Sequence, residues 1–207
     1  MLFLQGCCLD ILPLFSRGCV DFVLTDPPYI TSYQDRSGRS LLNDDNDAWL
    51  KPAFSEIYRV LAKDSYAVSF YGWHQADKFV DAWKSAGFRI AGHLVFPKGY
   101  ASSEGHIGYW HESAYLLAKG SPKPQRLIPD VLPWKYTGNR LHPTQKPVEA
   151  LKPLITAFSK PGAWVLDPFA GSGSTLAAAK ETGRDYFGIE LDPGYYAKAC
   201  RRLGYGP

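Results

Sequence analysis

The chain has 207 residues, a formal net charge of +3 and 45% hydrophobic residues. This length and composition predict one globular domain, with room for a small insertion, and exclude a disordered chain. No apolar run is long enough to span a membrane, and the four cysteines form neither a Cys-x-x-Cys pair nor a metal set with nearby histidines. We therefore expect a metal-free cytoplasmic protein with reduced thiols and no targeting leader.

Apolar runs and helical periodicities alternate along the sequence. In chain order, strands are predicted at 2–4, 20–25, 66–71, 88–96, 113–118, 163–166 and 186–189, and helices at 9–15, 47–61, 75–86, 147–159, 174–182 and 193–203. The alternation predicts an α/β fold with a mostly parallel sheet, helices on both faces and an antiparallel addition at one edge, formed by 88–96 and 113–118.

The early motif Asp26-Pro27-Pro28-Tyr29 follows the apolar strand 20–25. Open α/β sheets bind ligands at the carboxyl ends of their strands, where this motif lies. The Asp26 carboxylate and the Pro27 carbonyl could each accept a hydrogen from an aromatic amine, and the Tyr29 ring could stack on a base. A rigid proline turn with a packed tyrosine explains the tetrapeptide equally well when it is taken alone.

The late motif runs from Asp167 to Thr175, in the sequence Asp-Pro-Phe-Ala-Gly-Ser-Gly-Ser-Thr, and follows the strand 163–166. Gly171 and Gly173 allow a tight turn and a close approach of the backbone to a ligand, and Ser174-Thr175 begin a helix. The third glycine of a dinucleotide fingerprint is replaced by Leu176. An acid at the next strand end, Glu190, is typical of a residue that binds ribose hydroxyls.

A third motif, His142-Pro143-Thr144-Gln145-Lys146-Pro147, precedes the late one. The three motifs in this order resemble the permuted DNA amino-methyltransferases, which methylate adenine N6 or cytosine N4. The resemblance extends from Gln5 to Arg202. It implies a Rossmann-like methyltransferase fold over 1–207 and S-adenosylmethionine as the cofactor.

The resemblance also implies the role of each motif. Asp26, Pro27, Pro28 and Tyr29 would form the catalytic site, and an aspartate at the first position favours adenine N6. The cofactor would be bound by Asp167, Phe169, Gly171, Gly173, Ser174, Thr175 and Glu190, with Lys146 near its carboxylate. The family often has Gly-Asp near its start to contact the cofactor's adenine, whereas Gly6 is followed here by Cys7.

Two segments remain outside these motifs. Residues 30–48, with several aspartates, form either a flap over the target base or an acidic surface loop. Residues 99–141 interleave cations with aromatics, which suits target recognition but also an ordinary surface. We expect contacts with double-stranded DNA from Lys98, Lys123, Arg126, Lys135 and Arg140, and weaker, less salt-dependent DNA binding when Lys123 or Arg126 is neutralised.

Three alternatives stay open at this point. They are an N4-cytosine methyltransferase, a methyltransferase acting on RNA or a protein, and a catalytically idle DNA-binding remnant. Because the recognition segment is short, a homodimer or another partner could supply further DNA contacts. Whether the protein pairs with a cognate restriction endonuclease is also left open, because fold physics does not encode that role.

Overall fold

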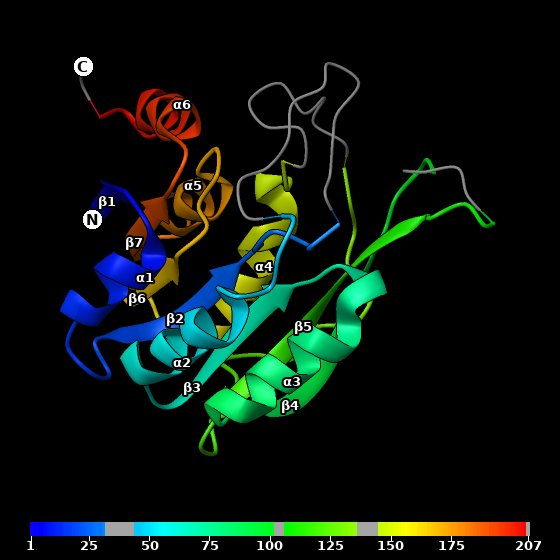
Figure 1. Cartoon of the computed structure of the whole chain (residues 1–207), viewed down its shortest axis with the longest axis horizontal. Helices are drawn as coiled ribbons and strands as arrows, with labels where there is room; N and C mark the ends of the chain where they lie inside the picture. The colour runs from blue at the N-terminus through cyan, green and yellow to red at the C-terminus, as the bar shows by residue number, and fades with distance from the viewer. Residues whose placement is uncertain (32–43, 102–105, 136–144, 206–207) are drawn as a thin grey trace.

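A seven-stranded sheet forms the centre of the computed structural model, which describes residues 1–31, 44–101, 106–135 and 145–205 (Figure 1). The strand order is β1-β7-β6-β2-β3-β5-β4. The strands are β1 (Leu2–Gln5), β2 (Val20–Thr25), β3 (Leu61–Phe70), β4 (Arg89–Pro97), β5 (His111–Lys119), β6 (Trp164–Asp167) and β7 (Asp185–Glu190). The predicted strands are confirmed, although β3 begins five residues earlier than expected.

The sheet is parallel except for β5, which runs antiparallel to both β3 and β4. The edge strand β4 points the same way as β3, because β5 lies between them and is antiparallel to both. The turn after β4 therefore leads the chain back between β3 and β4. The antiparallel strand is therefore second from the edge. Among the described residues, no helix is long and apolar enough to cross a membrane.

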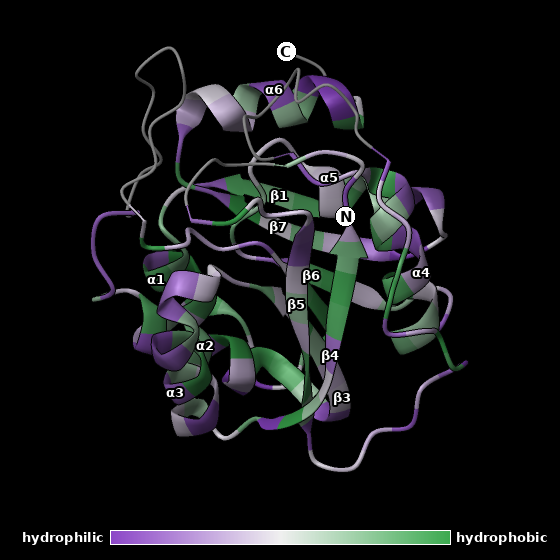
Figure 2. Cartoon of the chain, turned by 90° about the vertical axis from the view of Figure 1, so that its right-hand side faces the viewer, coloured by the Kyte–Doolittle hydropathy of each residue, from purple (hydrophilic) through white to green (hydrophobic). Residues whose placement is uncertain are grey.

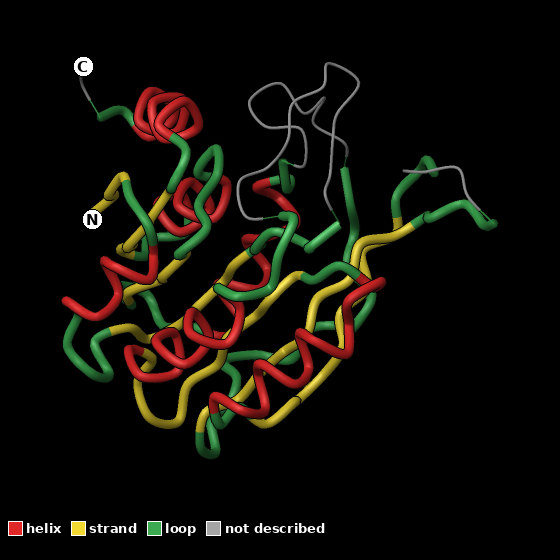
Figure 3. The backbone as a smooth tube through the Cα atoms, viewed as in Figure 1, coloured by secondary structure: helices red, strands yellow, loops and turns green. Residues whose placement is uncertain are grey.

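Helices cover both faces of the sheet, as predicted (Figures 1 and 3). They are α1 (Cys8–Ile11), α2 (Leu50–Val60), α3 (Ala76–Ala86), α4 (Val148–Phe158), α5 (Ser174–Glu181) and α6 (Pro193–Leu203). Side chains of a strand point alternately to the two faces. Accordingly Phe22 and Leu24 pack with α4, α5 and α6, whereas Val23 packs with α1, α2 and α3. Figure 2 shows the hydrophobic strands enclosed between these layers.

The parallel strands β2, β3, β6 and β7 all end on one side of the sheet, which is lined by strand ends and is distinct from the edge strands β1 and β4. This side is called the carboxyl edge, and the opposite side, where these strands begin, is called the amino edge. Strand β5 starts at the carboxyl edge, because Ala114 pairs with Phe70, and it ends at the amino edge, because Lys119 pairs with Ser65. Connections that leave the two edges therefore lie at opposite ends of the molecule.

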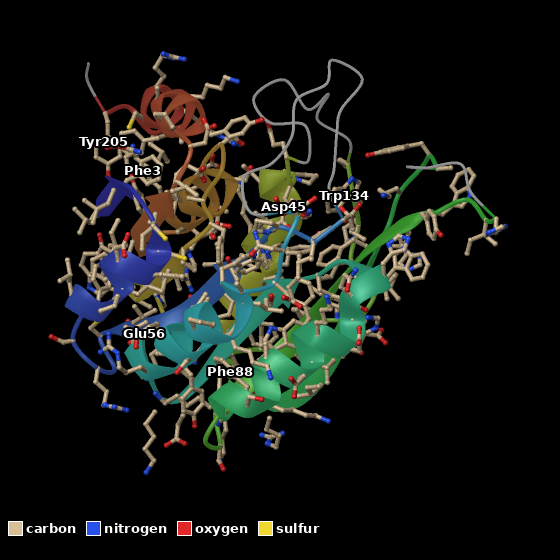
Figure 4. The ribbon with its side chains drawn as sticks, in the orientation of Figure 1. Phe3, Asp45, Glu56, Phe88, Trp134 and Tyr205 are labelled. Carbon is tan, nitrogen blue, oxygen red and sulfur yellow. The ribbon has the colours of Figure 1, made fainter. Side chains whose placement is uncertain are left out.

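The segment 99–141, predicted as one insertion, contains the sheet strand β5. It therefore consists of separate connections on either side of a structural strand. Residues 120–127 lie near the amino edge, where the backbone of Gln125 bonds to Ala157 near the end of α4. The chain then runs back along β4, pairing Val131 with Val95, and reaches the carboxyl edge at Trp134 (Figure 4). Of the other predicted segment, residues 32–43 lie outside the described residues.

Candidate active site

A cavity of about 180 Å³ opens at the carboxyl edge of the sheet. It lies where strands from the early and late parts of the chain end side by side, because β2 pairs with β6 and β6 with β7. All but one of the residues predicted to act in catalysis or cofactor binding line it: Asp26, Pro27, Pro28, Tyr29, Lys146, Asp167, Phe169, Gly171, Ser174, Thr175 and Glu190. The fold thus brings the two halves of the predicted site together in one cavity.

The Asp26 carboxylate lies at the end of β2 with both oxygens engaged. Its Oδ1 accepts a hydrogen bond from the Tyr29 hydroxyl at 2.9 Å, and its Oδ2 forms an ion pair with Lys146 Nζ at 2.8 Å. Lys146 also donates to the Tyr29 hydroxyl at 3.0 Å and is only 6% exposed. Burial raises the pKa of Asp26, while the Lys146 ammonium acts against that rise.

Behind this pair lies a further carboxylate, Glu112, at the beginning of β5. Its Oε1 is 2.7 Å from Lys98 Nζ, and its Oε2 is 3.8 Å from Lys146 Nζ and 3.5 Å from the Tyr29 hydroxyl. Burial opposes ionisation of Glu112, but the Lys146 and Lys98 ammonium groups hold its pKa below the usual value. Asp26, Glu112, Lys98 and Lys146 form two anion–cation pairs, so the cluster is balanced in charge.

The backbone around Tyr29 is held from two sides. A Cβ on Gly72 would lie 2.7 Å from Tyr29 Cβ and 2.9 Å from its carbonyl oxygen, so only glycine fits against the tyrosine. Ile30 has a φ of 59°, which is strained for a β-branched residue. The buried Asp44 stabilises this turn by accepting from the Ile30 N–H at 2.7 Å and the Thr31 hydroxyl at 3.1 Å.

Two further buried carboxylates lie at the ends of β6 and β7. Asp167 accepts from the Thr25 hydroxyl at 2.9 Å and the Phe169 N–H at 3.1 Å, and burial raises its pKa to about 7. Glu190 accepts from the Gly171 N–H at 2.6 Å and the Asp192 N–H at 2.8 Å, and burial raises its pKa as well. A cationic ligand would favour the ionised form of both groups.

The remaining walls of the cavity are partly aromatic. Phe169 packs against Trp49 with ring centroids 5.1 Å apart and an interplanar angle of 62°. Trp49 was not predicted, because its apolar neighbours in α2 mark it as an ordinary core residue. Cys7 lines the cavity where the family often has an acid, and the Gly6 N–H bonds to the Glu190 carbonyl at 2.8 Å.

Gly173 is the predicted site residue that does not line the cavity. Its φ of 77° caps the start of α5, and a Cβ there would approach Ala199 Cβ to 3.2 Å. Its role in the structure is to allow the turn and the close approach of α6, with no direct exposure to the ligand cavity. Ser174 also faces α6, where its hydroxyl accepts from Arg202 at 3.1 Å.

The predicted DNA-contacting cations are placed very differently from one another. Lys98 is 5% exposed and paired with Glu112, so it is an interior residue and the expectation of a phosphate contact is wrong. Lys123 and Arg126 are exposed but lie near the amino edge, away from the cavity, where Arg126 donates to Thr156. Lys135 alone among the described cations of this set is exposed at the carboxyl edge, and Arg140 lies outside the described residues.

Several residues of the site escaped prediction or were given no role. Glu112 begins an apolar strand, and Gly72 directly follows one. Position after a strand is a signal that could have directed attention to Gly72. The partnership of Lys146 with Asp26 could not be predicted, because two residues 120 positions apart in the chain show no local sign of the contact.

Comparison with known proteins now adds to this geometry. The family model of the DNA methylases matches residues 20–137 and 127–201. YubD of Escherichia coli (strain K12), named as a candidate methylase, is 55% identical over 202 residues, covering 97% of this chain and 89% of that protein. The DNA adenine methyltransferase YhdJ of the same organism is 30% identical over 242 residues, covering 97% and 81%.

The chain belongs to the N6/N4 DNA methylase family. Solved structures show the same fold. The M1.HpyAVI–SAM complex superposes with a TM-score of 0.78 at 21% identity, covering 98% of each chain. The PvuII DNA methyltransferase, titled cytosine-N4-specific, has a TM-score of 0.79 at 18% identity and covers 97% of this chain and 85% of that one.

As a member of this family, the protein is an S-adenosylmethionine-dependent DNA methyltransferase. The residues present fit that cofactor. Its ammonium and sulfonium call for an anionic neighbour, which Asp167 supplies, its ribose hydroxyls suit Glu190, and its adenine suits the aromatic wall formed by Phe169 and Trp49.

Proposed function

We propose that this protein methylates the exocyclic N6 amino group of adenine in DNA. The observation that carries the proposal is the Asp26 carboxylate, which lines the cavity while Tyr29 and Lys146 fix its orientation. The aspartate at this position and the name of the relative YhdJ support adenine as the target. The similarity to the PvuII enzyme, at 18% identity, supports the fold and is no argument for cytosine as the target base.

Two acceptors at the end of β2 would prepare the amine for attack. A carboxylate has about four lone-pair sites, and Tyr29 and Lys146 occupy two of those on Asp26. The remaining sites, together with the Pro27 carbonyl, would accept the two amino hydrogens of the base. Because these hydrogen bonds localise the nitrogen lone pair, they would aim it at the methyl donor.

The cofactor supplies the methyl group when it is bound. Asp167, Glu190 and the aromatic pair Phe169 and Trp49 would hold it so that its methyl group faces the end of β2. As the new N–C bond forms, the bond between the methyl carbon and the sulfonium sulfur would break and the sulfur would leave as a neutral thioether. The amine nitrogen becomes positive and must lose one proton. Asp26 is suited to accept that proton, because burial already raises its pKa.

Lys146 and Glu112 would act on the reaction through Asp26. The Lys146 ammonium favours the ionised form of Asp26 against the effect of burial on its pKa, and Glu112 with Lys98 balances the added charge. Lys146 Nζ also lies 5.2 Å from the centroid of the Tyr29 ring. The opposite face of that ring would then be left for a base turned out of the duplex.

Nucleoside analysis tests the proposal. Purified protein is incubated with isotope-labelled S-adenosylmethionine and DNA that lacks methylated bases, and the digested DNA is analysed by mass spectrometry. We expect label in N6-methyladenine. Label in N4-methylcytosine would overturn the choice of base and keep the mechanism, whereas label found only in added RNA or protein would overturn the proposed substrate.

A further inference from the structure

Exposed aromatic side chains follow the end of β3 and precede the start of β5, both at the carboxyl edge. Trp73 is 53% exposed and Trp110 is 55% exposed, which is unusual for side chains of this size. Trp73 stacks on His74 with centroids 3.7 Å apart, and Tyr109 lies 5.2 Å from Trp73. Trp73, His74 and Tyr109 are in ring contact, and Trp110 is the next residue of the chain after Tyr109; we call these four residues the aromatic surface.

Two connections of the sheet build this surface. Trp73 and His74 follow the end of β3, while Tyr109 and Trp110 immediately precede β5. Figure 1 shows that the described parts of the connection between β4 and β5, residues 98–101 and 106–110, extend beyond the body of the sheet at this edge. The Lys98 N–H bonds to the Trp110 carbonyl at 2.7 Å and fixes the base of this connection. The aromatic side chains are therefore presented from anchored backbone.

The aromatic surface is linked to the catalytic motif by residues that neighbour it in the chain. Trp73 directly follows Gly72, which packs closely against Tyr29. Trp110 is separated by one residue from Glu112, which contacts Tyr29 and Lys146. A duplex whose target base enters the cavity must lie over this edge, and neighbouring nucleotides are only about 3.4 Å apart along a strand.

We infer that the aromatic surface binds DNA by stacking on, or wedging between, the bases next to the target nucleotide. Flat exposed aromatic rings are suited to this contact, and apolar wedges stabilise unstacked bases in other DNA-binding proteins. This surface is largely uncharged, whereas the phosphates require cations. It would therefore provide affinity that depends weakly on salt and would help to hold the target base outside the duplex.

This inference rests on the proposed function and deepens it, so its test must separate the two. The affinity of the full-length protein for a fluorescent duplex is measured over a range of salt concentrations, with cofactor present, for the wild type, Trp73→Ala and Trp110→Ala. Because stacking on one base contributes roughly tenfold or more in affinity, we expect a loss of that size in each variant. The slope of log affinity against log salt should be unchanged.

Two controls sharpen the test. Leu127→Ala removes a side chain that is 90% exposed near the amino edge, and it should bind DNA as the wild type does. Trp73→Phe keeps an aromatic ring and should recover most of the affinity lost in Trp73→Ala. A fluorescent adenine analogue next to the target base should brighten on binding to the wild type and less so with the variants.

Wild-type affinity and an unchanged fluorescence signal in both tryptophan variants would overturn the inference, while wild-type methyl transfer would still stand. A change in oligomeric state on size-exclusion chromatography, without any change in DNA affinity, would overturn it as well and assign the surface to a second copy of the chain. A wild type that transfers no methyl group to DNA would instead overturn the proposed function.

Discussion

The two edges of the sheet use their cations differently. At the amino edge, Lys119 donates to the Tyr58 and Leu61 carbonyls at 2.6 and 2.5 Å, and Arg59 donates to Leu12 and Phe15 carbonyls at 2.8 Å. These cations satisfy backbone groups at the ends of helices and turns, and Arg59 also pairs with Glu56 of its own helix at 2.8 Å.

At the carboxyl edge, the cations meet carboxylates. Lys146 pairs with Asp26, and Lys98 pairs with Glu112, all largely buried. A buried charge pair is a poor source of stability, because desolvation offsets most of its attraction. The amino edge therefore stabilises the fold, whereas the carboxyl edge holds charges that can act on a substrate. A substitution at one edge can therefore be compared with a matched substitution at the other, which serves as its control.

The largest effect is expected for Lys146→Met. Without the ammonium, burial raises the pKa of Asp26 with less opposition, so the acid limb of the kcat profile should move to higher pH. Lys119→Met should lower the free energy of unfolding by about 1–3 kcal/mol but leave kcat per folded molecule unchanged. pH–rate profiles and chemical denaturation distinguish the two. A Lys146→Met profile that matches the wild type would remove Lys146 from the mechanism.

A smaller loss is expected for Gly72→Ala. The added Cβ would lie 2.7 Å from Tyr29 Cβ and must displace the catalytic turn. We expect kcat/KM for DNA to fall roughly tenfold, about 1.4 kcal/mol, with cofactor affinity unchanged. Gly99→Ala is the matched control, because among the described residues no atom beyond its chain neighbours lies within 4 Å of a Cβ at that position. Equal kcat/KM in the two variants would show that the exact placement of Tyr29 does not limit the reaction.

A pH effect on cofactor binding should be several-fold. The Asp167 pKa is about 7 in the folded protein and near 3.8 when unfolded, so the group contributes stability at low pH that is lost as pH rises from about 4 to about 7. A cationic cofactor favours the ionised form, so its affinity should increase between pH 6 and pH 8 in calorimetry. The increase should be absent in Asp167→Asn; an identical pH dependence in that variant would assign the effect to another group.

The smallest effect concerns the surface cations. Lys135→Ala should reduce the slope of log DNA affinity against log salt by about 0.9, the value for one phosphate contact. Arg126→Ala should leave the slope unchanged, because Arg126 lies near the amino edge and donates to Thr156. Binding titrations at several salt concentrations measure both. A reduced slope for Arg126→Ala would restore the original expectation for this residue and place DNA at both edges.

Much of the fold could be predicted because it is encoded locally. The two-residue alternation of β2, with Phe22 and Leu24 on one face and Val23 on the other, reflects burial of both faces. Gly87 directly follows the predicted helix 75–86 and ends α3 with a φ of 106°, a conformation that glycine adopts readily. The position of Asp26 and Glu190 at strand ends also follows from sequence, because strand ends in such sheets share one edge.

Contacts between distant segments could not be predicted in this way. The composition of 99–141 suggested one basic, aromatic surface, but β5 passes through it and separates its cations between the two edges. Lys98 and Lys123 look equivalent in the sequence, yet one is buried against Glu112 and the other is exposed. The pairing of β5 between β3 and β4 determines that Lys98 is buried and that Lys123 is exposed.

The central claim is that chemistry occurs at the carboxyl edge through Asp26, and strand β2 offers its own control. Asp21 lies near the amino end of the same strand, where it accepts from the Trp164 N–H at 2.8 Å. We would measure single-turnover methyl transfer to DNA for the wild type, Asp26→Asn and Asp21→Asn. The account predicts a loss of 100-fold or more, about 3 kcal/mol, for Asp26→Asn and a rate near that of the wild type for Asp21→Asn. Comparable rates in Asp26→Asn and the wild type would contradict it.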